Sequence, residues 1–123
     1  GDLQREIDDY SAVIDMPDAP AEQVAEARFN RGFTYGQRGL DGDVQRAIDD
    51  YSAVIDMPDA PAEQVARARV NRGVTYGQRG LDGDVQRAID DYSAVIDMPD
   101  APLDVRQFAI DRLNDLTGGT DPA

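Results

Sequence analysis

Pairs of adjacent aspartates are the first residues in this sequence with a possible chemical role, because two carboxylates can act as general acid and general base. The pairs recur at Asp8/Asp9, Asp49/Asp50 and Asp90/Asp91. Neighbouring residues on a helix point about 100° apart, so the two carboxylates of one pair do not face a common substrate. Arg46 and Asp50, four residues apart, are better explained as a surface ion pair that supports a helix. The pairs therefore predict no acid–base site.

A short acidic segment, Asp41-Gly42-Asp43, is a second candidate, since carboxylate oxygens are calcium ligands. It lacks the number and spacing of ligands in a calcium loop, and a solvent-exposed turn explains it better. The chain contains no histidine and no cysteine, which removes the common general bases, nucleophiles and soft metal ligands. A glycine-rich phosphate loop is also missing from the sequence. We therefore expect no enzymatic activity, no metal site and no cofactor.

The charge balance limits the possible partners. The formal net charge is −13, with 25 acidic and 12 basic residues. Binding to a phosphate backbone requires a basic face, so we expect no nucleic-acid partner. No apolar run approaches the length of a membrane span, and no signal peptide is visible. We expect a soluble chain without a membrane partner. The cytoplasm is the favoured compartment, although the sequence does not identify it.

The elements that position these residues follow from a repeat. One unit of 41 residues is written three times, as residues 1–41, 42–82 and 83–123. The first two units differ at five positions, and the third departs from the second only from Leu103 onward. A fixed period of this length predicts a repeat architecture, in which each unit packs mainly against its neighbours. The chain should form a single domain.

Each unit contains two helical segments. Residues 43–57 place apolar side chains three and four residues apart, with Asp43 as a candidate N-cap and a proline after the last turn. We call this segment helix B. Helix A, residues 61–79, opens with Pro61 at its first position and closes before Gly80. The whole chain then predicts six helices in the order B-A-B-A-B-A, over residues 2–16, 20–38, 43–57, 61–79, 84–98 and 102–117.

Short turns make successive helices antiparallel neighbours, so the predicted fold is an all-α solenoid of antiparallel helix pairs. Gly32 and Gly73 lie inside helix A, where glycine costs about 1 kcal/mol relative to alanine. Their repetition predicts the close approach of another helix. Residues 103–117 depart from the helix-A pattern and are interpreted as a C-terminal capping helix. Residues 118–123 are expected to be a frayed tail.

Two runs of residues recur at matching positions. They are Asn30-Arg31-Gly32-x-x-Tyr35-x-x-x-Gly39, followed by Asp43-x-x-x-Ala47-Ile48-x-Asp50-Tyr51-x-x-x-Ile55, and they return over residues 71–80 and 84–96. The pattern resembles the tetratricopeptide (TPR) repeat over nearly the whole chain. The resemblance implies a right-handed α-α superhelix in which helix A lines a concave groove that holds extended peptides or partner helices.

The period differs from that of the family. A TPR unit has 34 residues, whereas this unit has 41. The insertion Leu40-Asp41-Gly42 lengthens one turn, and the Met-Pro-Asp-Ala-Pro segment lengthens the other. The period and the longer A–B turn also resemble Sel1-like repeats, a TPR relative. Both extended turns leave the pitch of the superhelix open but not the pairing of the helices.

Five positions distinguish the first two units: Leu3/Val44, Glu6/Ala47, Glu26/Arg67, Phe29/Val70 and Phe33/Val74. In the TPR family that this chain resembles, the alanine that matches Glu6 packs against helix A of its own repeat. The first helix B has no helix A before it, so we expect Glu6 to face water. The last three positions lie on one face of helix A, the face that lines the groove in the family. The predicted peptide-binding residues are Glu26, Phe29, Asn30, Phe33, Gln37, Arg67, Val70, Asn71, Val74 and Gln78.

These residues have a competing explanation. Phe29 and Phe33 could be core residues, with Val70 and Val74 filling the same sites one unit later. Arg67 is better placed in the groove or at its rim, because a charge swap does not suit a packed core. An acidic group of a ligand could bind there.

We expect a non-catalytic scaffold that binds a protein or peptide partner of unknown identity and acts as a monomer. Two alternatives remain open. The chain could be a structural module that joins end to end, because the first helix B lacks a helix A and the last helix A lacks a helix B. It could also be an engineered or recently amplified array without a dedicated ligand.

Overall fold

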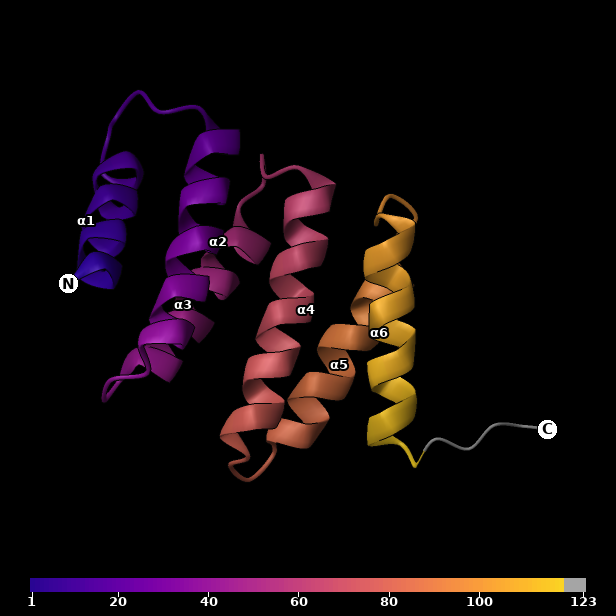
Figure 1. Cartoon of the computed structure of the whole chain (residues 1–123). Coiled ribbons are helices and arrows are strands. Elements are labelled where there is room, and N and C mark those ends of the chain that lie inside the picture. Colours follow the sequence, from indigo (N-terminus) through magenta and orange to yellow (C-terminus); the bar gives the residue numbers. More distant parts are fainter. Residues whose placement is uncertain (119–123) are drawn as a thin grey trace.

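The computed structural model describes residues 1–118. Within that range it contains six α-helices and no β-strand (Figure 1). The helices are α1 (Asp2–Ile14), α2 (Ala21–Arg38), α3 (Asp43–Asp56), α4 (Ala62–Arg79), α5 (Asp84–Ile96) and α6 (Leu103–Leu116). The predicted all-α class and the number and order of helices are confirmed, with every end within two residues of its expected place. Of the predicted tail, residues 119–123 lie outside the described part of the chain.

The helices form two layers. Each helix packs against the next one along the chain, and α2, α4 and α6 also contact one another in turn. In Figure 1 these three lie side by side in the nearer layer, while α3 and α5 run behind them. Because α2, α4 and α6 are the helix-A segments of the three units, we call their common surface the helix-A face.

Glycines set the turns that lead from helix A to helix B. Gly80 ends α4 with φ of 67°, in the left-handed region that the expected C-terminal glycine adopts. Gly42, with φ of 85°, precedes α3 as its N-cap. The expectation that Asp43 is the N-cap was therefore wrong by one residue. Asp43 is the first residue of the helix, and its carboxylate accepts the Leu40 N–H at 3.0 Å from within the turn. Pro61 likewise precedes α4 rather than opening it.

The core lies between the two layers. One cluster joins the alanines Ala25, Ala47 and Ala68 to Tyr51 and Val54, and a second surrounds Tyr92 and Val95 in the next unit. A Cβ atom added to Gly32 would lie 3.0 Å from Cε1 of Tyr51 and 3.3 Å from the carbonyl oxygen of Ala47. The predicted close approach at this glycine is confirmed. Gly73 has the same relation to Tyr92.

Arginines of helix A connect three consecutive helices. Arg31 of α2 donates two hydrogen bonds to the Asp50 carboxylate of α3, at 2.8 and 2.7 Å, and a third to Ser11 Oγ of α1 at 3.0 Å. Asp50 is only 4% exposed. The interpretation of Arg46 and Asp50 as a surface pair is therefore wrong, because Asp50 binds Arg31 and Arg46 binds Asp43 instead. The bridge recurs one unit later among Arg72, Asp91 and Ser52.

A second arginine on the same helix repeats this arrangement nearer the turn. Arg38 donates to Asp43 through two nitrogens, at 2.8 and 2.9 Å, and to Gln4 Oε1 of α1 at 2.6 Å. The hydrogen bonds from Arg38 hold the pKa of Asp43 well below its usual range, with smaller contributions from the Leu40 N–H and Arg46. Burial opposes this shift but does not outweigh it. Arg79, Asp84 and Gln45 form the same set one unit later.

Candidate binding groove

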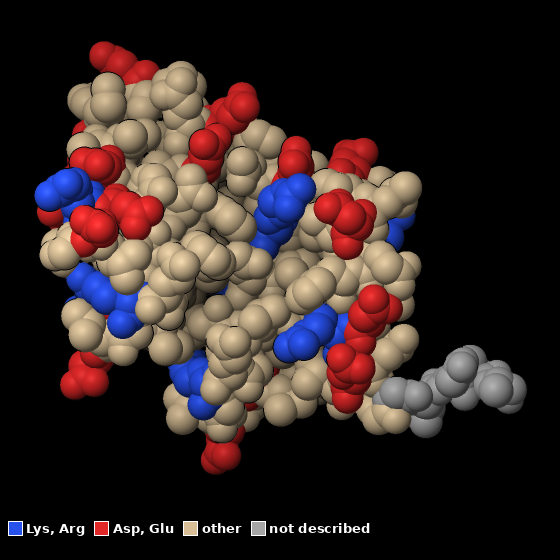
Figure 2. Space-filling model, viewed as in Figure 1, with Lys and Arg blue, Asp and Glu red and all other residues tan. Residues whose placement is uncertain are grey.

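Two adjacent pits hollow the helix-A face. Figure 2 shows this face with mostly uncharged surface over its middle, a few basic side chains beside it, and acidic side chains around much of its border. The first pit has a volume of about 380 Å³ and is lined by Phe33, Gly36, Gln37, Tyr51, Asn71, Val74, Thr75, Gln78 and Phe108. The second, of about 250 Å³, is lined by Phe29, Arg67, Val70, Asn71, Asp104, Val105 and Phe108. Since Asn71 and Phe108 line both, the pits are neighbours, and we call them together the groove.

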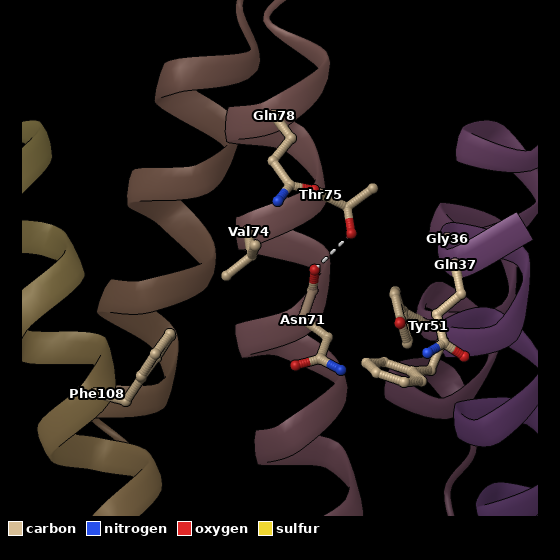
Figure 3. A pocket seen from close by; sticks show the side chains of 9 residues that line it. Gly36, Gln37, Tyr51, Asn71, Val74, Thr75, Gln78 and Phe108 are labelled. Atoms are coloured by element: carbon tan, nitrogen blue, oxygen red, sulfur yellow. Dashed lines mark hydrogen bonds between the residues drawn. The ribbon is translucent and has the colours of Figure 1, made fainter. Parts of the chain in front are cut away.

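The groove follows the axis of α4. In Figure 3, Asn71, Val74 and Gln78 rise from α4 in the middle, with Phe108 of α6 on one side and Gln37 and Tyr51 on the other. The lining residues of α4 run from position 67 to position 78. Eleven steps of 1.5 Å between these positions make this floor about 16 Å long. The walls are therefore α2 and α6, and the floor is one helix of the central unit.

Eight of the ten predicted site residues line the groove: Phe29, Phe33, Gln37, Arg67, Val70, Asn71, Val74 and Gln78. The other two, Glu26 and Asn30, do not line either pit. They line a third hollow of about 210 Å³, together with Tyr10 and Val13 of α1. This position on helix A faces the preceding unit, and α2 has only α1 on that side within the described chain.

The two phenylalanines, for which groove and core were equal alternatives, differ in their surroundings. Phe33 is 51% exposed and lines the first pit. Phe29 is half-buried, and its ring centre lies 5.8 Å from that of Tyr51 as it packs on the core cluster. One unit later, Val70 is only 6% exposed and belongs to the core. The groove thus has an exposed aromatic wall at Phe33 and a core-like base at Val70.

The polar groups of the groove are suited to hydrogen bonding rather than to covalent chemistry. Thr75 carries a hydroxyl in the first pit, but it donates to the Asn71 carbonyl oxygen at 2.7 Å (Figure 3). Burial raises the pKa of Tyr51 to about 12, and hydrogen bonding with Asn71 opposes that rise. A phenol with this pKa stays protonated at neutral pH. The lining residues therefore provide aromatic surface and amide groups, with no activated nucleophile among them.

Arg67 in the groove and Arg112 beside the lining residue Phe108 already have partners. Arg67 donates to the Glu63 carboxylate at 3.2 Å in an exposed i, i+4 pair. Arg112 of α6 lies over the ring of Phe108, with its guanidinium carbon 5.8 Å from the ring centre. Such contacts hold both cations near the groove without burying them.

Six residues that line the groove were not predicted as site residues: Gly36, Tyr51, Thr75, Asp104, Val105 and Phe108. Phe108 belongs to residues 103–117, which were interpreted as a capping helix and were not compared with the variable positions of the first two units. Phe108 lies 41 residues after Arg67 and 82 after Glu26, so one position of helix A reads Glu, Arg and Phe in the three units. Extending the comparison of units into the third would have identified it.

Comparison with protein families, with curated proteins and with solved structures finds no match for this chain. Among residues 1–118, no group of three or more acidic side chains gathers closely enough to hold a metal ion. None of the described helices combines the length and the apolar character needed to cross a membrane.

Proposed function

We propose that this chain is a non-catalytic scaffold that binds a protein or peptide segment in the groove. The observation that carries the proposal is the pair of large aromatic side chains that line one pit from two different units. Phe33 is 51% exposed and Phe108 is 44% exposed. Exposed apolar side chains gathered in a concavity with a few amide groups are typical of binding sites. Burial of both rings by a ligand would contribute about 25 cal/mol for each Å² covered.

The proposal includes an architecture. We infer a right-handed superhelix of antiparallel helix pairs of the TPR type, with Sel1-like repeats as the related alternative and the helix-A face as its concave side. Three features support it: each helix packs on the next, the helix-A segments contact one another, and glycines allow α2 and α4 to approach the following helices closely. The repeated residues that resemble the TPR pattern occupy these same contacts at Gly32 and Tyr51.

The end-to-end alternative has less support, because α6 lacks the groups by which α4 holds its next neighbour. Arg72 of α4 binds Asp91 of α5, but the matching position of α6 is Leu113. The buried Val70 of α4 corresponds to Asp111, which is exposed and accepts a hydrogen bond from Gln107 at 3.0 Å. A polar surface where a further helix would pack favours a monomer with α6 as its cap. Sedimentation tests this alternative, since association that grows with concentration would favour it.

A library of random peptides displayed on phage and panned against the purified chain tests the binding proposal. The selected peptides should bind the Phe33→Ala/Phe108→Ala double variant at least about tenfold more weakly. Leu40→Ala is the matched control, because Leu40 is as exposed as Phe33 but lines neither pit. All variants should melt within a few degrees of the parent. Peptides that bind the double variant unchanged would place the site elsewhere, and a collapsed melting temperature would show that the two rings belong to the core.

A further inference from the structure

We propose that the segment bound in the groove is an extended, cationic peptide that lies along α4. Two large apolar side chains, two residues apart, would enter the two pits, and a basic residue would lie at the edge where the helix-A segments begin. This inference rests on the proposed function of the groove and specifies its partner.

The spacing of the pits comes from α4. Val70 lines the second pit and Val74 the first, with Asn71 between them. Four residues of helix rise by about 6 Å. In an extended peptide, side chains at i and i+2 point the same way and lie about 6.7 Å apart. One apolar side chain can therefore enter each pit while the peptide backbone runs parallel to the helix axis, past Phe33 on one wall and Phe108 on the other.

A helical ligand with apolar residues at i and i+4 would match the same spacing. The polar groups that line the pits therefore decide between a helical and an extended ligand. Gln37 and Gln78 line the first pit with their side chains exposed, so their amide groups are open to a ligand. A helix satisfies its own backbone groups, whereas an extended segment brings unpaired N–H and C=O groups that need partners. The exposed amides at the rim therefore favour an extended backbone.

Charge fixes the direction of the segment. The three helix-A segments begin at the same edge of the molecule (Figure 1), and each has an acidic residue in its first turn: Glu22, Glu63 and Asp104. Figure 2 shows acidic side chains along this edge. Asp104 lines the second pit, and among the described residues it has no cationic partner, since its carboxylate accepts only the adjacent Val105 N–H at 2.9 Å. Arg67, the cation of that pit, is already held by Glu63.

The net charge of the whole chain also favours a cationic ligand. A net charge of −13 attracts a cationic segment at long range and repels an anionic one. The acidic first turns also stabilise their own helices through the helix dipole. That role leaves their charge exposed to a ligand. A basic residue is therefore expected at the end of the groove where α4 begins.

Four fluorescein-labelled heptapeptides, capped at both ends, test the inference by fluorescence anisotropy against the whole chain. The reference peptide is Lys-Lys-Leu-Ser-Phe-Ser-Gly. The others replace both lysines with glutamate, place leucine and phenylalanine next to each other, or move phenylalanine to the helical spacing of i+4. We expect the reference to bind about tenfold tighter than each of the others. Its affinity should fall as salt rises from about 0.05 to about 0.5 M, because the attraction is screened.

Variants of the chain test whether Asp104 causes the preference for lysine over glutamate and whether Phe33 binds the apolar side chains. Asp104→Asn should reduce the preference for lysine over glutamate several-fold. The matched control, Asp111→Asn on the same helix, removes a carboxylate that lines neither pit and should leave the preference unchanged. Phe33→Ala should weaken binding of the reference peptide about tenfold, whether it is combined with Asp104→Asn or with Asp111→Asn.

The outcomes separate the two proposals. Equal or tighter binding of the glutamate peptide overturns the cationic partner, and tighter binding of the i+4 peptide overturns the extended backbone. In both cases the groove proposal stands if binding still depends on Phe33 and Phe108. If none of the four peptides binds but phage-selected peptides depend on those rings, only this inference falls. If no peptide of either kind depends on them, both proposals fall.

Discussion

The helices α1 and α3 differ in sequence at two positions, yet they place the same aspartates in opposite surroundings. Asp43 and Asp50 of α3 are buried, whereas their counterparts in α1, Asp2 and Asp9, are exposed. The difference comes from α2, whose arginines reach forward to both carboxylates of α3. Within residues 1–118 no helix stands in that relation to α1. The role of an aspartate is therefore decided by the helix packed before it rather than by its local sequence.

One of the two sequence differences, Glu6 in α1 and Ala47 in α3, shows the same contrast between an exposed and a buried helix face. Glu6 of α1 is exposed, as the sequence predicts, and the matching Ala47 of α3 is 1% exposed. Tyr10 is only half-buried, whereas the matching Tyr51 is 3% exposed and packs against Phe29. A preceding helix A thus converts a solvent-exposed face of helix B into core. Exchanging residues between the two helices tests this conclusion.

The largest effect is expected from Ala47→Glu, which transfers the α1 residue into α3. The new carboxylate would be buried beside Ala25 and Tyr51 without a cationic partner. We expect a loss of about 4 kcal/mol in the free energy of unfolding, measured by urea denaturation followed by circular dichroism. The reverse change, Glu6→Ala, should alter it by less than about 0.5 kcal/mol. Equal effects of the two changes would contradict the division between the helices.

A smaller loss is expected from Asp50→Asn, which removes the charge that Arg31 binds. We expect a cost of about 2–3 kcal/mol, because the guanidinium keeps its partly buried position without a counter-charge. Asp9→Asn makes the same change in α1 and should cost less than about 0.5 kcal/mol. Urea unfolding of the two variants measures the difference, which should vanish if Arg31 contributes nothing to the packing of α2 on α3.

Acid should weaken the contacts that distinguish α3 and α5 from α1. The pKa of Asp43 and that of Asp84 are lowered in the folded chain by hydrogen bonds from Arg38 and Arg79. A lowered pKa contributes stability that is complete above the unfolded value of about 3.9 and is lost as pH falls further. The gap in unfolding midpoint between the parent and Asp43→Asn should therefore be constant from about pH 7 to 5 and shrink below about pH 4. A gap that does not change with pH would contradict the proposed origin of the shift.

Local patterns predicted the helices well, because proline, glycine and apolar spacing act within a few residues. They also predicted the close approach at Gly32, since an interior glycine costs stability unless another helix needs the space. The bridges were missed because Arg31 and Asp50 are 19 residues apart and meet only through the docking of α2 on α3. The nearer Arg46 looked like the partner of Asp50 by spacing alone. In the groove, Phe108 was missed for a different reason, since the comparison of variable positions stopped at the second unit although Phe108 aligns with Glu26 and Arg67.

The smallest effect concerns the contact surface between α2 and α3. Gly32→Ala would place a methyl group 3.0 Å from Tyr51 Cε1, whereas a methyl group at Gly77 would meet nothing within 4 Å. Both changes gain up to about 1 kcal/mol of helix propensity, so Gly77→Ala should stabilise the chain. Gly32→Ala should instead lose about 1–2 kcal/mol net, because the clash outweighs that gain. If thermal melts show both variants more stable than the parent, the two helices can separate without cost, and the close approach is not what holds α3 in the core.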